Sequence, residues 1–147
     1  TRVSAIDNLR YFADLYGVPT NVRDKRIKEL LQFMGLWDRA KDRVETYSKG
    51  MKQKISLLSA IMHKPQNLLL DEPVYGLDPL ASRAIQDFIK KRQGTTVLAT
   101  HSTQLVEQVA DIVYFLMQGR VIFHDSVSNL IHLYGSIENA YFFYKER

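Results

Sequence analysis

The sequence predicts an α/β protein in which a helical lobe precedes half of a parallel-sheet core that ends in a β-hairpin. Three observations support this prediction. Apolar residues recur at helical spacing through the first third of the chain. In the second half, short apolar or β-branched runs alternate with helical segments, which is typical of a parallel sheet. Finally, the run Leu68-Leu69-Leu70 ends abruptly in Asp71 and Glu72, as expected of a buried strand that brings acidic groups to the rim of a sheet.

Length and composition fit one domain of ordinary globular type. The 147 residues are 46% hydrophobic and 24% charged. No apolar run approaches the roughly 20 residues that a membrane-spanning helix needs. Nothing at the N-terminus resembles a signal peptide, and the absence of cysteine excludes disulfides and thiolate metal sites. We therefore expect a cytoplasmic protein without a structural metal.

The net charge of +4 is unevenly distributed. Residues 1–64 hold 13 Lys and Arg against 7 Asp and Glu, whereas residues 65–147 hold 7 against 9. A basic first half could face an anionic membrane leaflet or a nucleic acid. Because the basic residues are interspersed with acids and form no basic block, we interpret them as a solvated helical surface. Nucleic acid is not expected as a partner.

Three helices are predicted in residues 1–64. Ser4 is placed to cap the first and Asn21 the second, because each short polar side chain precedes apolar residues at helical spacing. The polar stretch 37–47 predicts a loop with one short turn, and Ser48 then caps the third helix. The expected buried faces are Ile6, Leu9, Phe12 and Tyr16; Ile27, Leu30, Leu31 and Met34; and Met51, Ile55, Leu58 and Met62.

Strands and helices alternate after residue 65. Strands are predicted at 67–71 and 95–100 with a helix at 80–91 between them, and such a unit implies parallel pairing through a right-handed crossover. Gln118-Gly119 lies between two further strand-like runs and predicts a two-residue hairpin turn. The remaining predicted elements are a helix at 103–110, strands at 112–117 and 120–124, and helices at 126–134 and 137–144.

Four short motifs follow one another along the chain. They are Tyr47-Ser48-Lys49-Gly50-Met51, Leu68-Leu69-Leu70-Asp71-Glu72-Pro73, Gly76-Leu77-Asp78-Pro79 and Thr100-His101-Ser102. This ordered set resembles the ATP-binding cassette (ABC) ATPase family, with its signature motif, Walker B strand and catalytic glutamate, D-loop and switch histidine. The resemblance extends over essentially the whole chain. Its signature motif is similar to that of the subunits that drive bacterial ABC-2-type exporters.

The resemblance implies a partial ABC-type P-loop NTPase domain. Residues 1–64 would form the helical subdomain that ends in the signature helix, and residues 65–147 the C-terminal half of the ATPase core. No Gly-Lys dipeptide occurs in the sequence, so the phosphate loop G-x-x-x-x-G-K-[ST] (Walker A) is missing. The Q-loop is missing as well. We therefore expect the 147 residues alone to lack ATPase activity.

The two carboxylates after the first strand and the histidine after the second form the expected catalytic set. Adjacent strand residues point to opposite faces of a sheet, so Asp71 and Glu72 can take different roles. The resemblance implies that Asp71 binds Mg²⁺ and that Glu72 is the general base that polarises the attacking water. It also implies that His101 contacts the γ-phosphate or orients the water.

Nucleotide binding is assigned to the signature motif. A helix N-terminus such as the one at Ser48 attracts anions. The resemblance implies that Ser48, Lys49, Gly50, Met51 and nearby backbone amides contact the γ-phosphate of ATP held by a second nucleotide-binding domain. Lys49 replaces the first glycine of the common Leu-Ser-Gly-Gly-Gln form, and its charge either points toward the phosphate or lies in solvent.

Asp78 is the last nucleotide-binding candidate. It fits a helix cap, with Pro79 at the first helical position, and capping alone would explain it. The resemblance adds a role at the interface of a cassette dimer. The preceding Val74-Tyr75 departs from the small polar residues usual in the family.

The resemblance therefore implies the ATP-binding and ATP-hydrolysing subunit of an ABC exporter on the inner face of the cell membrane. Its cofactors would be ATP and Mg²⁺, and its partners a second nucleotide-binding domain and a transmembrane subunit. Two alternatives stay open. One is a truncated, non-catalytic interaction module, which the missing phosphate loop favours. The other is a soluble ABC ATPase that acts on nucleic acid or ribosomes, against which the lack of coiled-coil heptads and of a second cassette counts.

Overall fold

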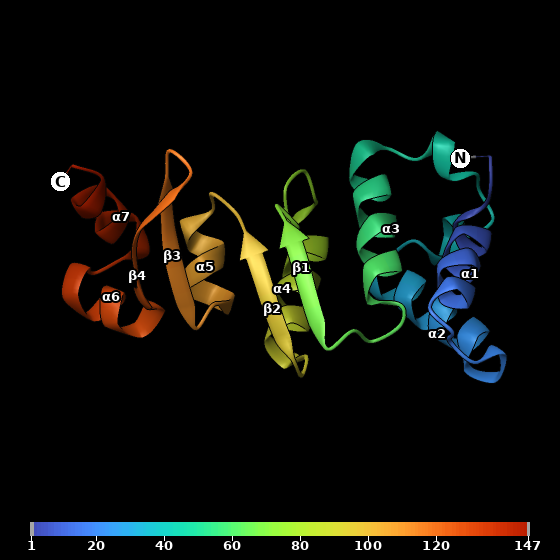
Figure 1. Cartoon of the computed structure of the whole chain (residues 1–147). Coiled ribbons are helices and arrows are strands. Elements are labelled where there is room, and N and C mark those ends of the chain that lie inside the picture. Colours follow the sequence, from blue (N-terminus) through green and yellow to red (C-terminus); the bar gives the residue numbers. More distant parts are fainter. Residues whose placement is uncertain (1, 147) are drawn as a thin grey trace. The chain divides into compact units, whose positions relative to one another are not determined.

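The computed structural model describes residues 2–146, which separate into two compact units. One unit ends at Leu98 and the other begins at Ala99. Figure 1 shows the order of helices and strands along the chain. This division differs from the functional one at residues 64 and 65, which stays a prediction about the parts of an ATPase core.

Three helices form the start of the first unit: α1 (Ala5–Leu15), α2 (Thr20–Phe33) and α3 (Lys49–Ile61). Helix α1 packs against both α2 and α3. Ser4 caps α1 as expected, since its hydroxyl accepts a hydrogen bond from the Asp7 amide at 3.1 Å. The side chains buried in this unit include Ala5, Leu9, Ala13, Ile27, Leu31, Leu58 and Met62.

Two sequence-based expectations for these helices are wrong. Helix α2 begins at Thr20 after Pro19, whose carbonyl accepts hydrogen bonds from the amides of Val22 and Arg23, and no side chain caps it. Asn21 therefore lies inside the first turn instead of capping the helix. On α1 the fully buried positions are Ala5, Leu9 and Ala13, and Tyr16 is 50% exposed. Small residues on this face let the helices approach closely.

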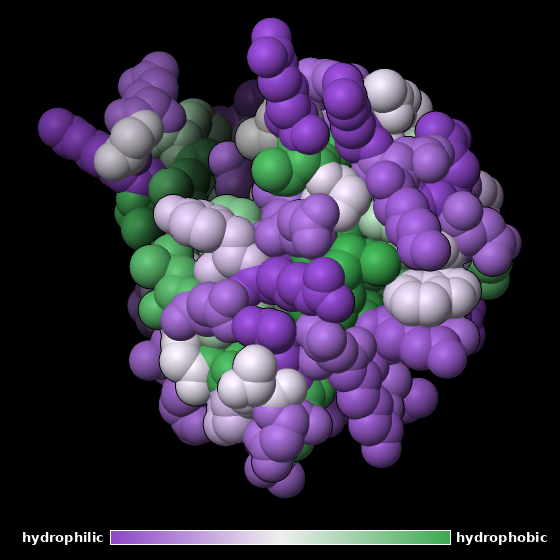
Figure 2. Space-filling view, turned by 90° about the vertical axis from the view of Figure 1, so that its right-hand side faces the viewer, coloured by the Kyte–Doolittle hydropathy of each residue, from purple (hydrophilic) through white to green (hydrophobic). Residues whose placement is uncertain are grey.

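The connection between α2 and α3 contains two short 3₁₀ helices, η1 (Trp37–Arg39) and η2 (Val44–Thr46), where one turn was expected. Figure 2 shows the side of the molecule on which α1 and α2 lie, and its surface is mostly hydrophilic. Ion pairs such as Arg10–Asp24 and Arg23–Asp14 lie on these helices. The basic residues of the helical lobe are thus at least partly balanced by acidic neighbours.

A strand–helix–strand segment completes the first unit. Strands β1 (Asn67–Asp71) and β2 (Thr95–Ala99) pair with each other and are joined through α4 (Pro79–Lys91). Figure 1 shows the two strands running in the same direction, as the sequence predicts. In β1 burial alternates: Leu68 and Leu70 are buried, and Leu69 is 76% exposed.

The second unit contains α5 (Thr103–Val109), a hairpin of β3 (Ile112–Met117) and β4 (Arg120–Ser126), then α6 (Val127–Tyr134) and α7 (Ile137–Lys145). The hairpin turn at Gln118-Gly119 has φ angles of 50° and 74°, the positive values that a two-residue type I′ turn requires. Phe115 on β3 packs with residues of α6 and α7. Tyr144 stacks on Phe123 at 3.8 Å between ring centroids, whereas its neighbours Phe142 and Phe143 are exposed.

Within residues 2–146, no helix combines the length and apolar character needed to cross a membrane.

Candidate functional site

The N-terminus of α3 is open to solvent. Ser48 has extended backbone angles, and its hydroxyl oxygen accepts a hydrogen bond from the Met51 amide at 3.2 Å. Ser48 and Lys49 are exposed, and Gly50 and Met51 are partly buried. The predicted cap is confirmed. The remaining first-turn amides and the helix dipole make this end of α3 a suitable place for an anion.

The first two turns of α3 lie against the loop that follows β1. A β-carbon on Gly50 would come within 2.9 Å of the Gly76 carbonyl oxygen, so the two backbones approach each other too closely for any other residue. Four residues further along α3, the Lys54 ammonium donates to Asp78 Oδ2 at 2.7 Å. The D-loop therefore rests directly on the signature helix.

Both carboxylate oxygens of Asp78 are engaged within the chain. Oδ1 accepts from the Ala81 amide at 2.8 Å and caps α4, as the sequence predicts, and Oδ2 accepts from Lys54. The hydrogen bond from Lys54, followed by that from the Ala81 amide, lowers the pKa of Asp78 below its usual value. Sequence reasoning missed Lys54. The available signal was its position four residues after Gly50, which places both on one face of α3.

A third contact joins α3 to the same loop. The Lys49 ammonium lies 5.4 Å from the centroid of the Tyr75 ring, in the range of a cation–π interaction. Both residues are exposed, and each stands at a position where this sequence departs from the common family form. Tyr75 was not among the expected site residues.

The two adjacent carboxylates lie at the C-terminal end of β1. Asp71 is the last residue of the strand and is exposed, and Glu72 is partly buried. Glu72 has a φ of 44°, a left-handed conformation that costs a residue with a β-carbon about 1–2 kcal/mol. Its carbonyl oxygen accepts from the Tyr75 amide at 3.1 Å, which closes the turn. Such strain is concentrated at functional sites.

The carboxylates at the end of β1 fit Mg²⁺ only if a bound nucleotide supplies further ligands. Among the described residues, no group of three or more Asp, Glu or His is placed to hold a metal. Mg²⁺ in phosphate sites is usually bound by one or two carboxylates, with phosphate oxygens and water as the other ligands. The exposed Asp71 carboxylate meets that requirement.

His101 follows β2, which ends at Ala99, and it precedes the Ser102 cap of α5. Its side chain is exposed. His101 belongs to the second unit and Glu72 to the first. Its action beside Glu72 therefore stays a prediction.

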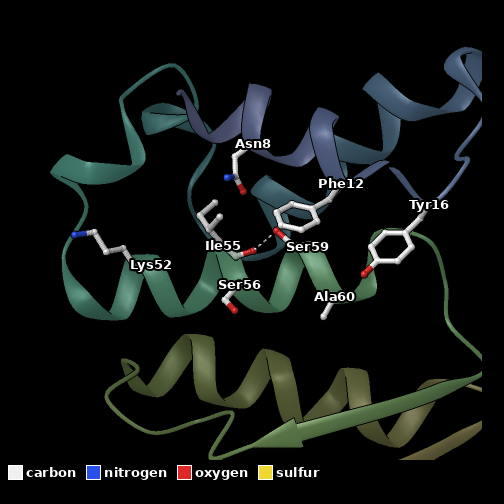
Figure 3. Close-up of a pocket in the computed structure, with 8 residues that line it drawn as sticks. All are labelled: Asn8, Phe12, Tyr16, Lys52, Ile55, Ser56, Ser59 and Ala60. Carbon is white, nitrogen blue, oxygen red and sulfur yellow. Dashed lines mark hydrogen bonds between the residues drawn. The ribbon is translucent and has the colours of Figure 1, made fainter. Parts of the chain in front are cut away.

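An open groove of about 380 Å³ lies between α1 and α3. Figure 3 shows the side chains that line it: Asn8 and Phe12 on α1, Tyr16 directly after that helix, and several residues of α3, including Lys52. None of the expected nucleotide, metal or catalytic residues is among them. The predicted nucleotide and metal residues lie instead at the start of α3 and the end of β1, and their role stays a prediction.

Comparisons with known proteins identify the family to which this fold belongs. A family model described as ABC transporter matches residues 2–75. A solved structure titled "Structure of ATP binding subunit of ABC transporter" superposes with a TM-score of 0.89 at 27% sequence identity, covering 97% of this chain and 62% of that one. The chain belongs to the ABC transporter family, and the expected fold class is confirmed.

Several curated relatives are ATP-binding proteins of bacteria. The ABC transporter ATP-binding protein NatA of Bacillus subtilis is 34% identical over 145 residues, which are 97% of this chain and 59% of the relative. The linearmycin resistance ATP-binding protein LnrL of the same organism is 38% identical, over 82% of this chain and 40% of the relative. The bacitracin transport ATP-binding protein BcrA of Enterococcus faecalis is 32% identical, over 88% and 42%. The chain thus spans about half the length of these relatives.

Proposed function

We propose that this chain carries the signature, Walker B, D-loop and switch segments of an ATP-hydrolysing subunit that drives an ABC exporter. The observation that carries the proposal is the joining of α3 to the loop that follows β1 by the Gly50–Gly76 and Lys54–Asp78 contacts. The N-terminus of α3, proposed to bind phosphate, and the two carboxylates proposed for catalysis thus belong to one compact unit.

Each residue has a distinct role in the proposal. Ser48, Gly50 and the first-turn amides of α3 bind the γ-phosphate of ATP presented by a second nucleotide-binding domain. Asp71 holds Mg²⁺, which neutralises charge on the phosphates when it is bound. Glu72 orients and deprotonates the attacking water. His101 contacts the γ-phosphate or that water.

The partners follow from the same proposal. A second cassette completes each ATP site. A transmembrane subunit is coupled to ATP hydrolysis, and binding to it keeps the protein on the inner face of the cell membrane. The name of BcrA as a bacitracin transport protein and that of LnrL as a linearmycin resistance protein support an export role. A phosphate loop has to be supplied from outside these 147 residues. A nucleic-acid role finds less support, because several basic residues of the helical lobe, Arg10 and Arg23 among them, are paired with acids.

Glu72→Gln in the whole ATP-binding subunit tests the proposal. The change keeps size and hydrogen-bonding reach but removes the charge that activates water. ATP hydrolysis should fall by about 10²–10⁴-fold while Mg-ATP binding is retained. Glu45→Gln, at an exposed position of the helical lobe, is the matched control and should hydrolyse ATP like the parent. Turnover within a few-fold of the parent in Glu72→Gln would show that Glu72 is not the base.

Ser48→Arg tests the signature site separately. A large cation at the cap should block formation of the ATP-bound dimer but leave ATP binding to the monomer intact, since the phosphate loop lies elsewhere. Light scattering with ATP in the Glu72→Gln background measures the dimer. Ser56→Arg, at an exposed position of the same helix, should dimerise normally. Equal dimerisation of Ser48→Arg would contradict the assignment of Ser48.

A further inference from the structure

An open groove of about 590 Å³ lies between α4 and the end of α2. Its large apolar side chains are Phe33, Leu80 and Phe88. Phe33 is the last residue of α2 and is 40% exposed, and Leu80, the second residue of α4, is 82% exposed. None of the residues proposed for ATP or Mg²⁺ lines this groove. Exposed apolar side chains that border a concave surface are typical of a site that binds another protein.

Helix α4 has two apolar faces. Its buried face consists of Ala81, Ile85 and Ile89. Each of these residues is preceded by an apolar residue that lines the groove, and this second set is Leu80, Ala84 and Phe88. A spacing of four residues places the second set on one side of the helix. An apolar line at i, i+4 and i+8, with Phe33 across from it, suits the packing of an amphipathic helix.

The rim of the groove is basic. Arg83, Lys91 and Arg92 line it, and among the described residues Asp87 is the one acidic side chain that does so. Asp87 is paired with Arg83 at 3.8 Å. Arg92 donates to main-chain carbonyls and to a threonine hydroxyl, all of them neutral, and the ion pairs within residues 2–146 do not include Lys91.

The charge of the rim complements an acidic partner. The helix dipole favours basic residues in the last turn of α4, but it does not explain why exposed apolar side chains lie beside them. Positive charge without an acidic neighbour favours a partner that carries Asp or Glu next to its apolar residues. The concave shape fits a single helix better than the flat surface of a bilayer.

We propose that this groove binds an acidic amphipathic helix of another protein. The apolar side chains of that helix pack on Phe33, Leu80 and Phe88, and its carboxylates pair with Lys91 and Arg92. The inference goes beyond the proposed function, because the ATP site gives α4 no role except to follow Asp78, which caps it.

Fluorescence anisotropy with the whole ATP-binding subunit tests the proposal. The probe is a labelled peptide of about 15 residues, long enough to become helical when bound, with leucines at helical spacing and glutamates on both flanks. The parent should bind it with a Kd of tens of micromolar. The same peptide with lysine in place of each glutamate should bind about ten-fold more weakly. Equal affinity for the two peptides, or binding of neither, would overturn the proposal.

Two matched pairs of variants locate the bound peptide. Lys91→Glu should weaken binding about ten-fold, whereas Lys90→Glu, at an adjacent exposed lysine that does not line the groove, should stay within about two-fold of the parent. Leu80→Gln should also weaken binding about ten-fold, because Leu80 loses apolar area that the peptide would cover. Leu15→Gln, at a residue of α1 that is 61% exposed, should bind like the parent.

All four substituted residues are exposed, so each variant is expected to keep the fold. Equal effects within either pair would show that the peptide binds elsewhere, and the proposal would be wrong.

Two other occupants of the groove give different results. Sedimentation with phosphatidylglycerol vesicles tests a membrane surface. Vesicle binding that Lys91→Glu and Leu80→Gln abolish, without binding of the acidic peptide, would overturn the proposal in favour of lipid. Self-association of the whole subunit that the same two variants abolish, again without peptide binding, would identify a second copy of this chain as the occupant.

Discussion

Asp78 joins two helices through a single carboxylate. It caps α4 and accepts from Lys54, whose side chain is only 12% exposed. We expect Asp78→Ala to lower the free energy of unfolding by about 1–2 kcal/mol, because the cap is lost and the Lys54 ammonium is left without its partner. Urea unfolding measures the change. Asp87→Ala removes an exposed ion pair with Arg83 on the same helix and should cost less than about 0.5 kcal/mol. Equal losses in the two variants would contradict this prediction.

The same carboxylate predicts sensitivity to acid. Its pKa is lowered, first by the hydrogen bond from Lys54 and then by that from the Ala81 amide. Because the pKa of Asp78 is lower in the folded state than in the unfolded state, its ionised carboxylate stabilises the fold at pH values above about 3.9, the ordinary pKa of an aspartate. This stabilisation is lost as the pH falls through the folded-state pKa. Below about pH 4, the parent should therefore lose stability more steeply than Asp78→Asn. Parallel pH profiles would show that Asp78 contributes nothing to acid unfolding.

Local chemistry and distant contacts differ in how well the sequence predicts them. The caps at Ser48 and Asp78 could be predicted, because each depends on residues within one helical turn. The partner of Asp78 could not, since Lys54 lies 24 residues away in the chain and only the folded loop brings it near. Gly50 was expected to contact phosphate, and the structure shows that its missing side chain makes room for Gly76. The roles of Asp71, Glu72 and His101 remain predictions that mutagenesis has to test.

At the scale of elements, strands and helices were predicted to within a few residues, because apolar periodicity and turn residues mark them clearly. The wrong predictions concern segments whose conformation is set by the backbone and not by a polar side chain or an apolar pattern. Pro19 starts α2 without a polar side chain, so the choice of Asn21 as cap was wrong. Residues 37–47 form two 3₁₀ turns, whose short length leaves almost no periodic pattern in the sequence.

Gly94 sets the connection between α4 and β2. Its φ is 98°, and a β-carbon there would lie 2.1 Å from the Gln66 carbonyl oxygen, which also accepts from the Thr95 amide at 3.0 Å. Gly94→Ala should therefore displace the chain before β1 and destabilise the protein by about 3 kcal/mol or more. Gly17 has a φ of 68° but open space around it, so Gly17→Ala isolates the backbone strain and should cost about 1 kcal/mol. Equal costs in urea unfolding would show that the close approach to Gln66 is unimportant.

At the scale of the whole molecule, the chain by itself is expected to bind ATP weakly. Without a phosphate loop, the β- and γ-phosphates lack their main ligands, and in the proposed function the signature residues act on ATP held by another cassette. Calorimetry on the 147-residue chain should show no Mg-ATP binding tighter than about millimolar, equivalent to roughly 4 kcal/mol, and no measurable turnover. Micromolar binding would overturn this expectation.

The two small sheets predict how the isolated chain behaves in solution. Among the described residues, β1 pairs only with β2 and β3 only with β4, so outer strand edges are left open in each sheet. Apolar side chains are exposed as well: Leu69 is 76% and Val97 58% exposed in the first sheet, and Leu116 is 63% exposed in the second. Open edges beside exposed apolar side chains favour pairing with another chain.

We therefore expect the 147-residue chain to self-associate as its concentration rises, and light scattering measures the average mass. Leu69→Lys/Val97→Lys should reduce association, because a charge on each strand opposes both burial and edge pairing. The control Gln104→Lys/Gln108→Lys adds the same charge at exposed positions of α5 and should associate like the parent. A monodisperse monomer of the parent at high concentration would contradict the prediction. Equal reduction in both double variants would show that net charge, and not the open sheet, controls association.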